Sequence, residues 1–178
     1  TSSSYTLVQE DIGSVITVTV TADGTHATGS VTSAGTATIA KADGPSAPTA
    51  PVLASKTTSS INLTAVTGQE YSMDNGVTWQ DSATFSGLTP NTSYTLVTRV
   101  KETATQNASS ASEGGTFKTD ALPAIGGTVS ITGTAKYGET LTADTTAVTY
   151  IPSTGSDSLS YQWKRDGAAI LEATSSSY

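Results

Sequence analysis

Two aromatic side chains, Trp79 and Tyr71, are the residues of this chain best suited to hold a ligand. They lie on either side of the turn Asp74-Asn75-Gly76. Exposed aromatic rings offer flat apolar faces with a polar edge, against which a sugar ring can pack. Alternatively, both rings fill the core of a small domain, which needs large side chains to bury enough surface. The sequence favours the core, and a carbohydrate platform at Trp79 and Tyr71 remains the alternative.

Other chemistry-bearing residues lack partners at a useful spacing. His26 is the only histidine and there is no cysteine, so a zinc site or a nucleophile–base pair would be incomplete. The turns Asp74-Asn75-Gly76 and Asp166-Gly167 are rich in oxygen but lack the spacing of a calcium loop. No nucleophile elbow or phosphate-binding loop is present. We therefore expect no catalytic residue, no bound metal, no cofactor and no enzymatic activity.

The charge of the chain argues against two classes of partner. The net charge of −7 is spread along the sequence, and no segment is basic. A nucleic-acid-binding surface needs clustered Lys and Arg, and so does attachment to an anionic membrane. No apolar run is long enough to cross a bilayer. We expect neither a nucleic-acid partner nor a membrane span.

The elements that must position these residues are predicted to be strands. Thr alternates with Val, Ile, Leu and Tyr, which is the pattern of half-buried strands, and no segment has helical periodicity. Asn75-Gly76 is a strong hairpin signal, because both residues tolerate positive φ. The predicted strands cover residues 15–21, 31–40 with interruptions, 60–64, 70–73, 77–79, 93–100, 116–119, 127–133, 138–143 and 159–165. The fold class is therefore predicted to be all-β.

Proline-containing linkers divide the chain into three parts. Residues 44–51 contain repeated proline, which favours a stiff, extended linker, and residues 121–123 form a second, shorter one. The expected parts are residues 1–43, 52–120 and 124–178.

The central part resembles a fibronectin type III module. That family carries the pattern Leu-x-Pro-x-Thr-x-Tyr before a central strand, and the matching residues here are Leu88, Pro90, Thr92 and Tyr94. The resemblance implies a β-sandwich over residues 52–120, in which the tyrosine hydroxyl ties a corner back to the main chain. The chain departs from the family in having its tryptophan, Trp79, in a hairpin.

The two outer parts resemble halves of one immunoglobulin-like domain of bacterial surface repeats. Residues 1–5 and 174–178 are the same pentapeptide, Thr-Ser-Ser-Ser-Tyr. The segment Tyr161-Gln162-Trp163 matches the third-strand tryptophan of that family, and Asp11-x-Gly13 matches its turn into the sixth strand. The resemblance implies that residues 1–43 are the C-terminal part, and residues 124–178 the N-terminal part, of such a sandwich.

This organisation leads us to expect a structural or adhesive repeat protein, secreted or on a bacterial cell surface. It would form a rod, a stalk or a head-to-tail filament. Its partners would be neighbouring repeats or identical subunits that complete the split domain, and a polysaccharide or host surface. Covalent repetition of the unit, complementation between separate chains and closure within one chain all remain open. The alternative function is a carbohydrate-binding or spacer module of a secreted polysaccharide-degrading enzyme.

Overall fold

The structure is a computed structural model that describes residues 3–151 and 157–178. Thr1 and Ser2 of the first pentapeptide lie outside the described residues. The fold is all-β, built from small antiparallel sheets and one 3₁₀ turn, as the alternation of Thr with apolar residues predicted. The chain divides into two compact units, Thr1–Asp120 and Ala121–Tyr178.

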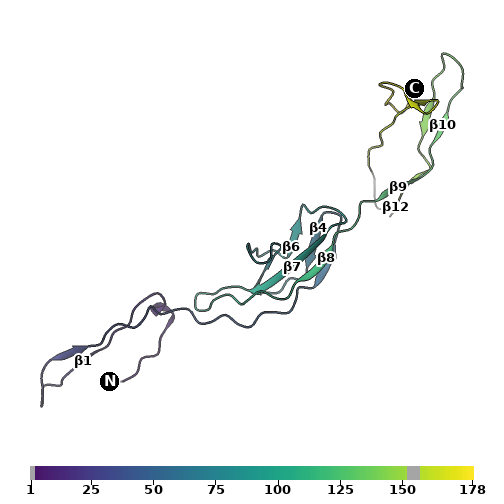
Figure 1. Ribbon diagram of the computed structural model, residues 1–178. Helices are drawn as coiled ribbons and strands as arrows, with labels where there is room; N and C mark the ends of the chain where they lie inside the picture. Colours follow the sequence, from purple (N-terminus) through teal and green to yellow (C-terminus); the bar gives the residue numbers. More distant parts are fainter. Residues whose placement is uncertain (1–2, 152–156) are drawn as a thin grey trace. The chain divides into compact units, whose positions relative to one another are not determined.

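The elements follow one another in short segments (Figure 1). In the first unit they are η1 (Gln9–Asp11), β1 (Thr19–Thr21), β2 (Ser30–Thr32), β3 (Leu53–Lys56), β4 (Ser60–Leu63), β5 (Gln69–Ser72), β6 (Thr84–Ser86), β7 (Ser93–Val100) and β8 (Gly115–Lys118). In the second unit they are β9 (Ala124–Gly127), β10 (Ser130–Thr132), β11 (Thr142–Asp144), β12 (Val148–Ile151), β13 (Lys164–Arg165) and β14 (Ala168–Ala169).

Two three-stranded sheets enclose the core of the first unit. Their strand orders are β3-β4-β6 and β5-β7-β8, and all pairs are antiparallel. Alternate residues of β4 are buried, because successive side chains of a strand point to opposite faces. The core residues are Ile61, Leu63, Tyr71, Phe85, Leu88 and Leu96. They come from both sheets and from the connection before β7, so a single apolar layer joins the two sheets.

The segment before β7 is held by hydroxyl groups. Tyr94 Oη accepts a hydrogen bond of 2.9 Å from the backbone N–H of Thr89, five residues upstream. Thr119 Oγ1 donates to the carbonyl of Thr89 at 2.7 Å, and the N–H of Thr92 donates to Thr119 Oγ1 at 3.0 Å. These bonds join the entry to β7 with the end of β8.

The predicted hairpin at Asn75-Gly76 is only partly formed. Both residues have positive φ, 59° and 85°, as the dipeptide predicted. However, residues 77–79 form no strand; instead Asp74 accepts hydrogen bonds from the backbone N–H and the hydroxyl of Thr78. A short acidic side chain in a turn competes for backbone donors in this way, and here it replaces the strand ladder.

The long strand predicted at 15–21 is paired as a regular ladder only over β1, with β2. Before β1 the two sides of the hairpin still meet: Ser33 N–H donates to the carbonyl of Val18, and Thr36 N–H to that of Ile16. The hydroxyls of Ser33 and Thr36 accept from the N–H groups of Val18 and Ile16. Side-chain oxygens thus take the place of backbone carbonyls, which interrupts the ladder. We call residues 14–40 the N-terminal hairpin.

The segment that directly follows the N-terminal hairpin contacts the central part. Lys41 forms an ion pair with Glu102 and donates a hydrogen bond of 2.8 Å to the carbonyl of Thr103. The backbone of Ala42 bonds that of Thr105 and Asn107 at 2.9 and 3.0 Å. The two residues that follow the hairpin are therefore bonded to the loop that follows β7.

The second unit consists of three two-stranded ladders, β12-β9, β10-β11 and β13-β14. The strand predicted at 127–133 is broken at Gly127, which has a φ of 78° that continuous strand backbone does not adopt. The strand predicted at 159–165 forms a regular ladder only over β13, which turns through Asp166-Gly167 into β14, and Trp163 adds backbone hydrogen bonds to Ile170 and Ala173. None of the described residues of this unit is buried.

Candidate functional site

The structure places the two aromatic residues of the predicted platform in different environments. Tyr71 lies in the core at 2% exposure, and its hydroxyl accepts a hydrogen bond of 2.7 Å from the N–H of Val66. Trp79 is half-buried, and its Nε1 donates to the carbonyl of Gly76 at 3.0 Å. Tyr71 therefore presents no face to a ligand, which favours the core interpretation for this residue.

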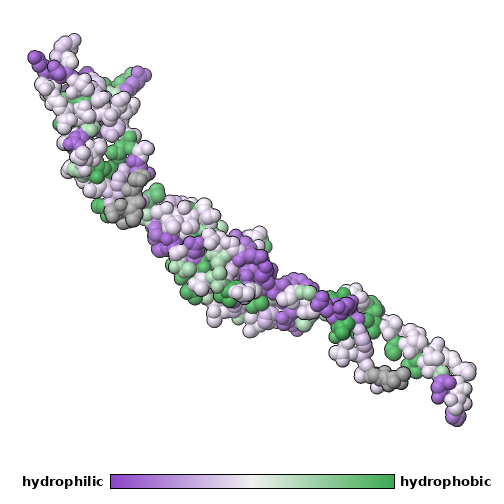
Figure 2. Space-filling model, turned by 180° about the vertical axis from the view of Figure 1, so that it is seen from behind, coloured by the Kyte–Doolittle hydropathy of each residue, from purple (hydrophilic) through white to green (hydrophobic). Residues whose placement is uncertain are grey.

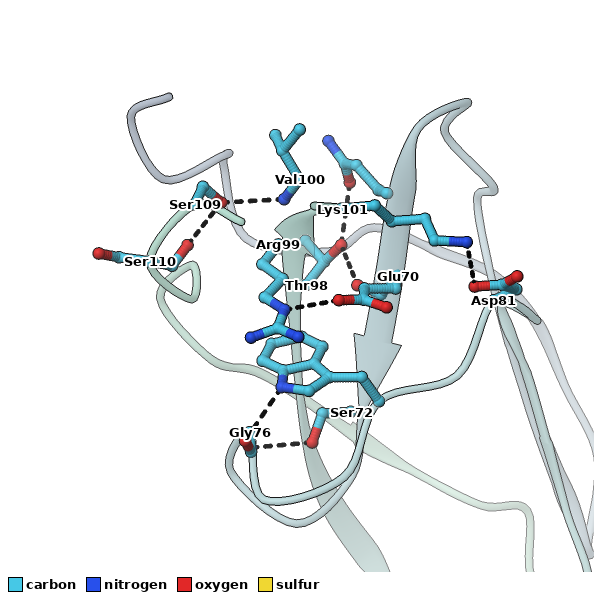
Figure 3. Close-up of polar contacts among 12 residues, drawn as sticks. Glu70, Ser72, Gly76, Asp81, Thr98, Arg99, Val100, Lys101, Ser109 and Ser110 are labelled. Carbon is cyan, nitrogen blue, oxygen red and sulfur yellow. Dashed lines mark hydrogen bonds and ion pairs between the residues drawn. The ribbon is translucent and has the colours of Figure 1, made fainter. Parts of the chain in front are cut away.

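Trp79 is also covered on one face by a cation. The guanidinium of Arg99 lies 4.3 Å from the centre of the indole ring. Arg99 Nε is paired with Glu70 Oε1 at 2.6 Å across the β5-β7 ladder, and Lys101 is paired with Asp81 at 2.6 Å (Figure 3). A cation over an indole ring is attracted by the π electrons and blocks that face to a sugar. The remaining hollow beside Trp79 measures about 280 Å³ and includes the buried Tyr71 among its walls.

The larger concavity lies in the second unit and is mostly apolar. It measures about 590 Å³. Its walls include Ile131 of β10, Ala143 of β11, Val148 of β12, and the side chains of Leu159, Tyr161 and Trp163. Hydrophobic residues also reach the surface of this unit in Figure 2. We call this concavity the Trp163 groove. Exposed apolar surfaces of this kind are typical of sites that bind another apolar surface.

Trp163 is held in place by the second pentapeptide copy. Its Nε1 donates to the carbonyl of Ser175 at 2.9 Å, and its ring stacks on Tyr178 with the ring centres 5.8 Å apart. The backbone of Tyr178 in turn pairs with Leu141, at 2.8 and 2.9 Å. The pentapeptide thus acts as a strand beside β11, which fixes one wall of the Trp163 groove.

The N-terminal hairpin carries an apolar face with no cover among the described residues. Val20 lies opposite Val31 in the β1-β2 ladder, and Ile16 and Val18 lie on the same face because strand side chains alternate. Val18, Val20 and Val31 are 61%, 68% and 76% exposed. The opposite face carries Thr, and the hydroxyls of Thr19 and Thr32 lie 2.7 Å apart. The hairpin is amphipathic, with its apolar face open.

The tyrosines that end the two pentapeptide copies contact opposite charges. Tyr5 Oη donates to Asp11 Oδ2 at 2.9 Å, and this hydrogen bond to a carboxylate raises the pKa of Tyr5. Tyr178 Oη accepts a bond of 3.4 Å from Arg165. Asp11 ends η1 and also accepts from the N–H of Val8, while Gly13 follows with a φ of 85°. The last residue of the shared pentapeptide therefore contacts an acidic residue in one unit and a basic residue in the other.

Other candidates from the sequence acquire no ligand-binding arrangement. His26 is exposed in the loop between β1 and β2. Within residues 3–151 and 157–178, no three His, Cys, Asp or Glu side chains are grouped so that they could hold a metal ion. Over the same residues, no helix has the length and apolarity needed to cross a membrane.

Sequence reasoning missed Arg99 and Arg165, whose partners lie far along the chain. For Arg165 a signal existed, because the repeated pentapeptide identifies Tyr5 and Tyr178 as equivalent residues. For Arg99 the partner Glu70 follows only from strand register, which the sequence did not specify.

No protein-family model matches this chain, and no curated protein sequence matches it.

Proposed function

We propose that this chain is part of a structural or adhesive repeat protein of a bacterial cell surface, a rod, stalk or filament. In this proposal residues 52–120 form a fibronectin III-like sandwich, and residues 1–43 and 124–178 are parts of immunoglobulin-like sandwiches. The protein is secreted, and its function is to space or present modules rather than to catalyse a reaction.

The observation that carries the proposal is the junction between the N-terminal hairpin and the central part. Lys41 and Ala42 make an ion pair and several hydrogen bonds with residues 102–107, just before the proline-containing segment 44–51. In a flexible tether, these backbone groups would form hydrogen bonds with water instead. Bonded junctions followed by stiff linkers suit a protein that transmits force or holds modules apart.

The alternative of a carbohydrate-binding module has less support. Its discriminating feature is a pair of exposed, coplanar rings at Trp79 and Tyr71. Tyr71 lies in the core, and Arg99 covers one face of Trp79. A single half-buried indole ring offers a sugar little of the apolar surface that such modules use.

The direct test is the size and location of the protein in its source organism. Antibodies raised against residues 1–178 should label the outside of intact cells, and the labelled protein should run under denaturing conditions well above the 18.0 kDa of this chain. Labelling restricted to the cell interior would contradict the proposal. Saturable binding of a polysaccharide that Trp79→Ala abolishes would favour the alternative function.

A further inference from the structure

The Trp163 groove and the apolar face of the N-terminal hairpin are two open surfaces of one chain. We infer that they are complementary: the Trp163 groove accepts the N-terminal hairpin of a second copy of this chain. The two pieces together form one closed β-domain, and copies join head to tail. This inference rests on the proposed structural function and names the contact by which copies would be joined.

The pentapeptide repeat identifies the occupant. In the second unit Ser176 and Tyr178 pair with Ala143 and Leu141 beside β11, which places the pentapeptide as a strand of that unit. In the first unit the same sequence leads through η1 into the N-terminal hairpin. Because the two copies share one sequence, the segment that follows the first copy, Thr6–Ala40, is the segment that we expect beside the second unit. The second copy of the chain would supply it, starting after its own Tyr5.

The surfaces match in chemistry. Among the described residues, the walls of the Trp163 groove are apolar apart from a few polar groups, and Lys164 is the one charged residue. The facing surface of the hairpin is Ile16, Val18, Val20 and Val31, without any charge. An uncharged, exposed strand edge is a template for pairing with another chain, and proteins usually protect such edges with charges. Here the hairpin sides, residues 14–22 and 27–40, contain none.

The charges at the corner match as well. Tyr5 donates its hydroxyl proton to Asp11 in one unit, and Tyr178 accepts from Arg165 in the other. When a hairpin enters the groove, a single tyrosine hydroxyl takes the place that Tyr5 holds beside Asp11 and that Tyr178 holds beside Arg165. Asp11 of the incoming copy and Arg165 of the receiving copy then both contact this hydroxyl. Antiparallel pairing of residues 14–21 of the incoming copy with residues 159–165 of the receiving copy has the same consequence. It places the start of the hairpin, close to Asp11, opposite Arg165. The result is an ion pair between copies.

Each copy offers one hairpin and one groove, so the contact is heterologous and can propagate. The test uses two blocked variants of the whole chain. Val18→Asp places a charge on the hairpin face and leaves the groove intact, whereas Trp163→Asp spoils the groove and leaves the hairpin intact. Light scattering after size-exclusion chromatography gives the molar mass at increasing concentration.

We expect the unmodified chain to grow in mass with concentration, and each variant alone to remain at 18.0 kDa. An equimolar mixture of the two variants should form a complex of two chains and no larger species, because it contains one intact hairpin and one intact groove per pair. Thr17→Asp is the matched control: it lies on the same strand but on the polar face, and should associate like the unmodified chain. Heteronuclear NMR of each variant checks that the central part stays folded.

A second pair of variants tests the same contact without changing Trp163, so that the test does not depend on the folding of Trp163→Asp. Arg165→Asp should weaken association at least tenfold, and mixing it with Asp11→Arg should restore growth in mass with concentration, because every contact between the two variants then pairs an acid with an arginine. An unmodified chain that remains monomeric up to millimolar concentration would overturn the inference, as would association that Val18→Asp and Trp163→Asp leave unchanged. Either result would leave the cell-surface proposal standing, because that proposal depends on cell labelling and denatured mass.

Discussion

The central part of the chain and its second unit are built from similar Thr-rich strands, yet only one has a closed core. Leu96 of β7 is fully buried, whereas Ile131 of β10 is 64% exposed. Residues 61–119 contain every buried residue among those described. The difference is the facing sheet: β5-β7-β8 covers β3-β4-β6, whereas the described residues of the second unit form small separate ladders, one of them extended by the pentapeptide beside β11. Isolated two-stranded ladders are marginally stable, so strand pattern without a partner layer does not make a core.

The largest expected effect comes from shortening apolar residues in the two regions. Leu96→Ala should lower the free energy of unfolding of the central part by about 2–5 kcal/mol, since it opens a cavity in a packed core. Ile131→Ala should cost less than about 0.5 kcal/mol in dilute, unassociated chains, because the side chain is already in water. Urea titration followed by the indole N–H signals of Trp79 and Trp163 reports the two regions separately. Equal losses would show that the second unit has a closed core of its own.

A smaller effect is expected from the two tyrosine corners. Tyr94→Phe removes the acceptor for the N–H of Thr89 and should destabilise the central part by about 1 kcal/mol. Tyr5→Phe should have no measurable effect on the stability of the unassociated chain, because Tyr5 is 62% exposed and its hydroxyl can bond water instead. Thermal unfolding of both variants beside the unmodified chain measures this. A loss for Tyr5→Phe as large as that for Tyr94→Phe would contradict the comparison.

The smallest effect is the response of two similar turns to acid. Hydrogen bonds from Thr78 and Ser72 hold the pKa of Asp74 at about 2, and bonds from Thr146 lower the pKa of Asp144 in the second unit. A folded-state pKa below the unfolded value means that the stabilisation is present above about pH 3.9 and is lost as the pH falls toward the folded pKa. Titration of the carboxyl carbons by NMR should therefore show Asp74 still ionised near pH 3. Asp74→Asn should remove this part of the acid dependence, and an ordinary pKa at Asp74 would contradict it.

Local sequence signals predicted those features that depend on neighbours along the chain. The strand at residues 93–100, the positive φ of Asn75 and Gly76, and the turn at Asp166-Gly167 follow from alternation and turn chemistry. They could be read because the residues that cause them are within a few positions of one another. The strands predicted at 15–21 and 127–133 are shorter or broken, since hydroxyls of distant Ser and Thr residues, or a kink at Gly127, interrupt the pairing.

The candidate sites required the tertiary structure. Whether Tyr71 faces a ligand or the core depends on which sheet covers β5, and the pairing of Arg99 with Glu70 depends on strand register. The sequence did contain one long-range signal, the repeated pentapeptide, because identity between two distant segments can be seen without knowing the structure.

The sequence by itself therefore determined the all-β class, the turns and the identity of the two pentapeptide copies, all of which follow from local backbone preferences or from the residues themselves. Only the tertiary structure decided that Tyr71 and Leu96 are buried while Val18 and Ile131 are open. The reason is physical: alternation gives each strand an apolar face, but burial needs a second layer opposite that face, and a second layer is a property of the fold rather than of the strand.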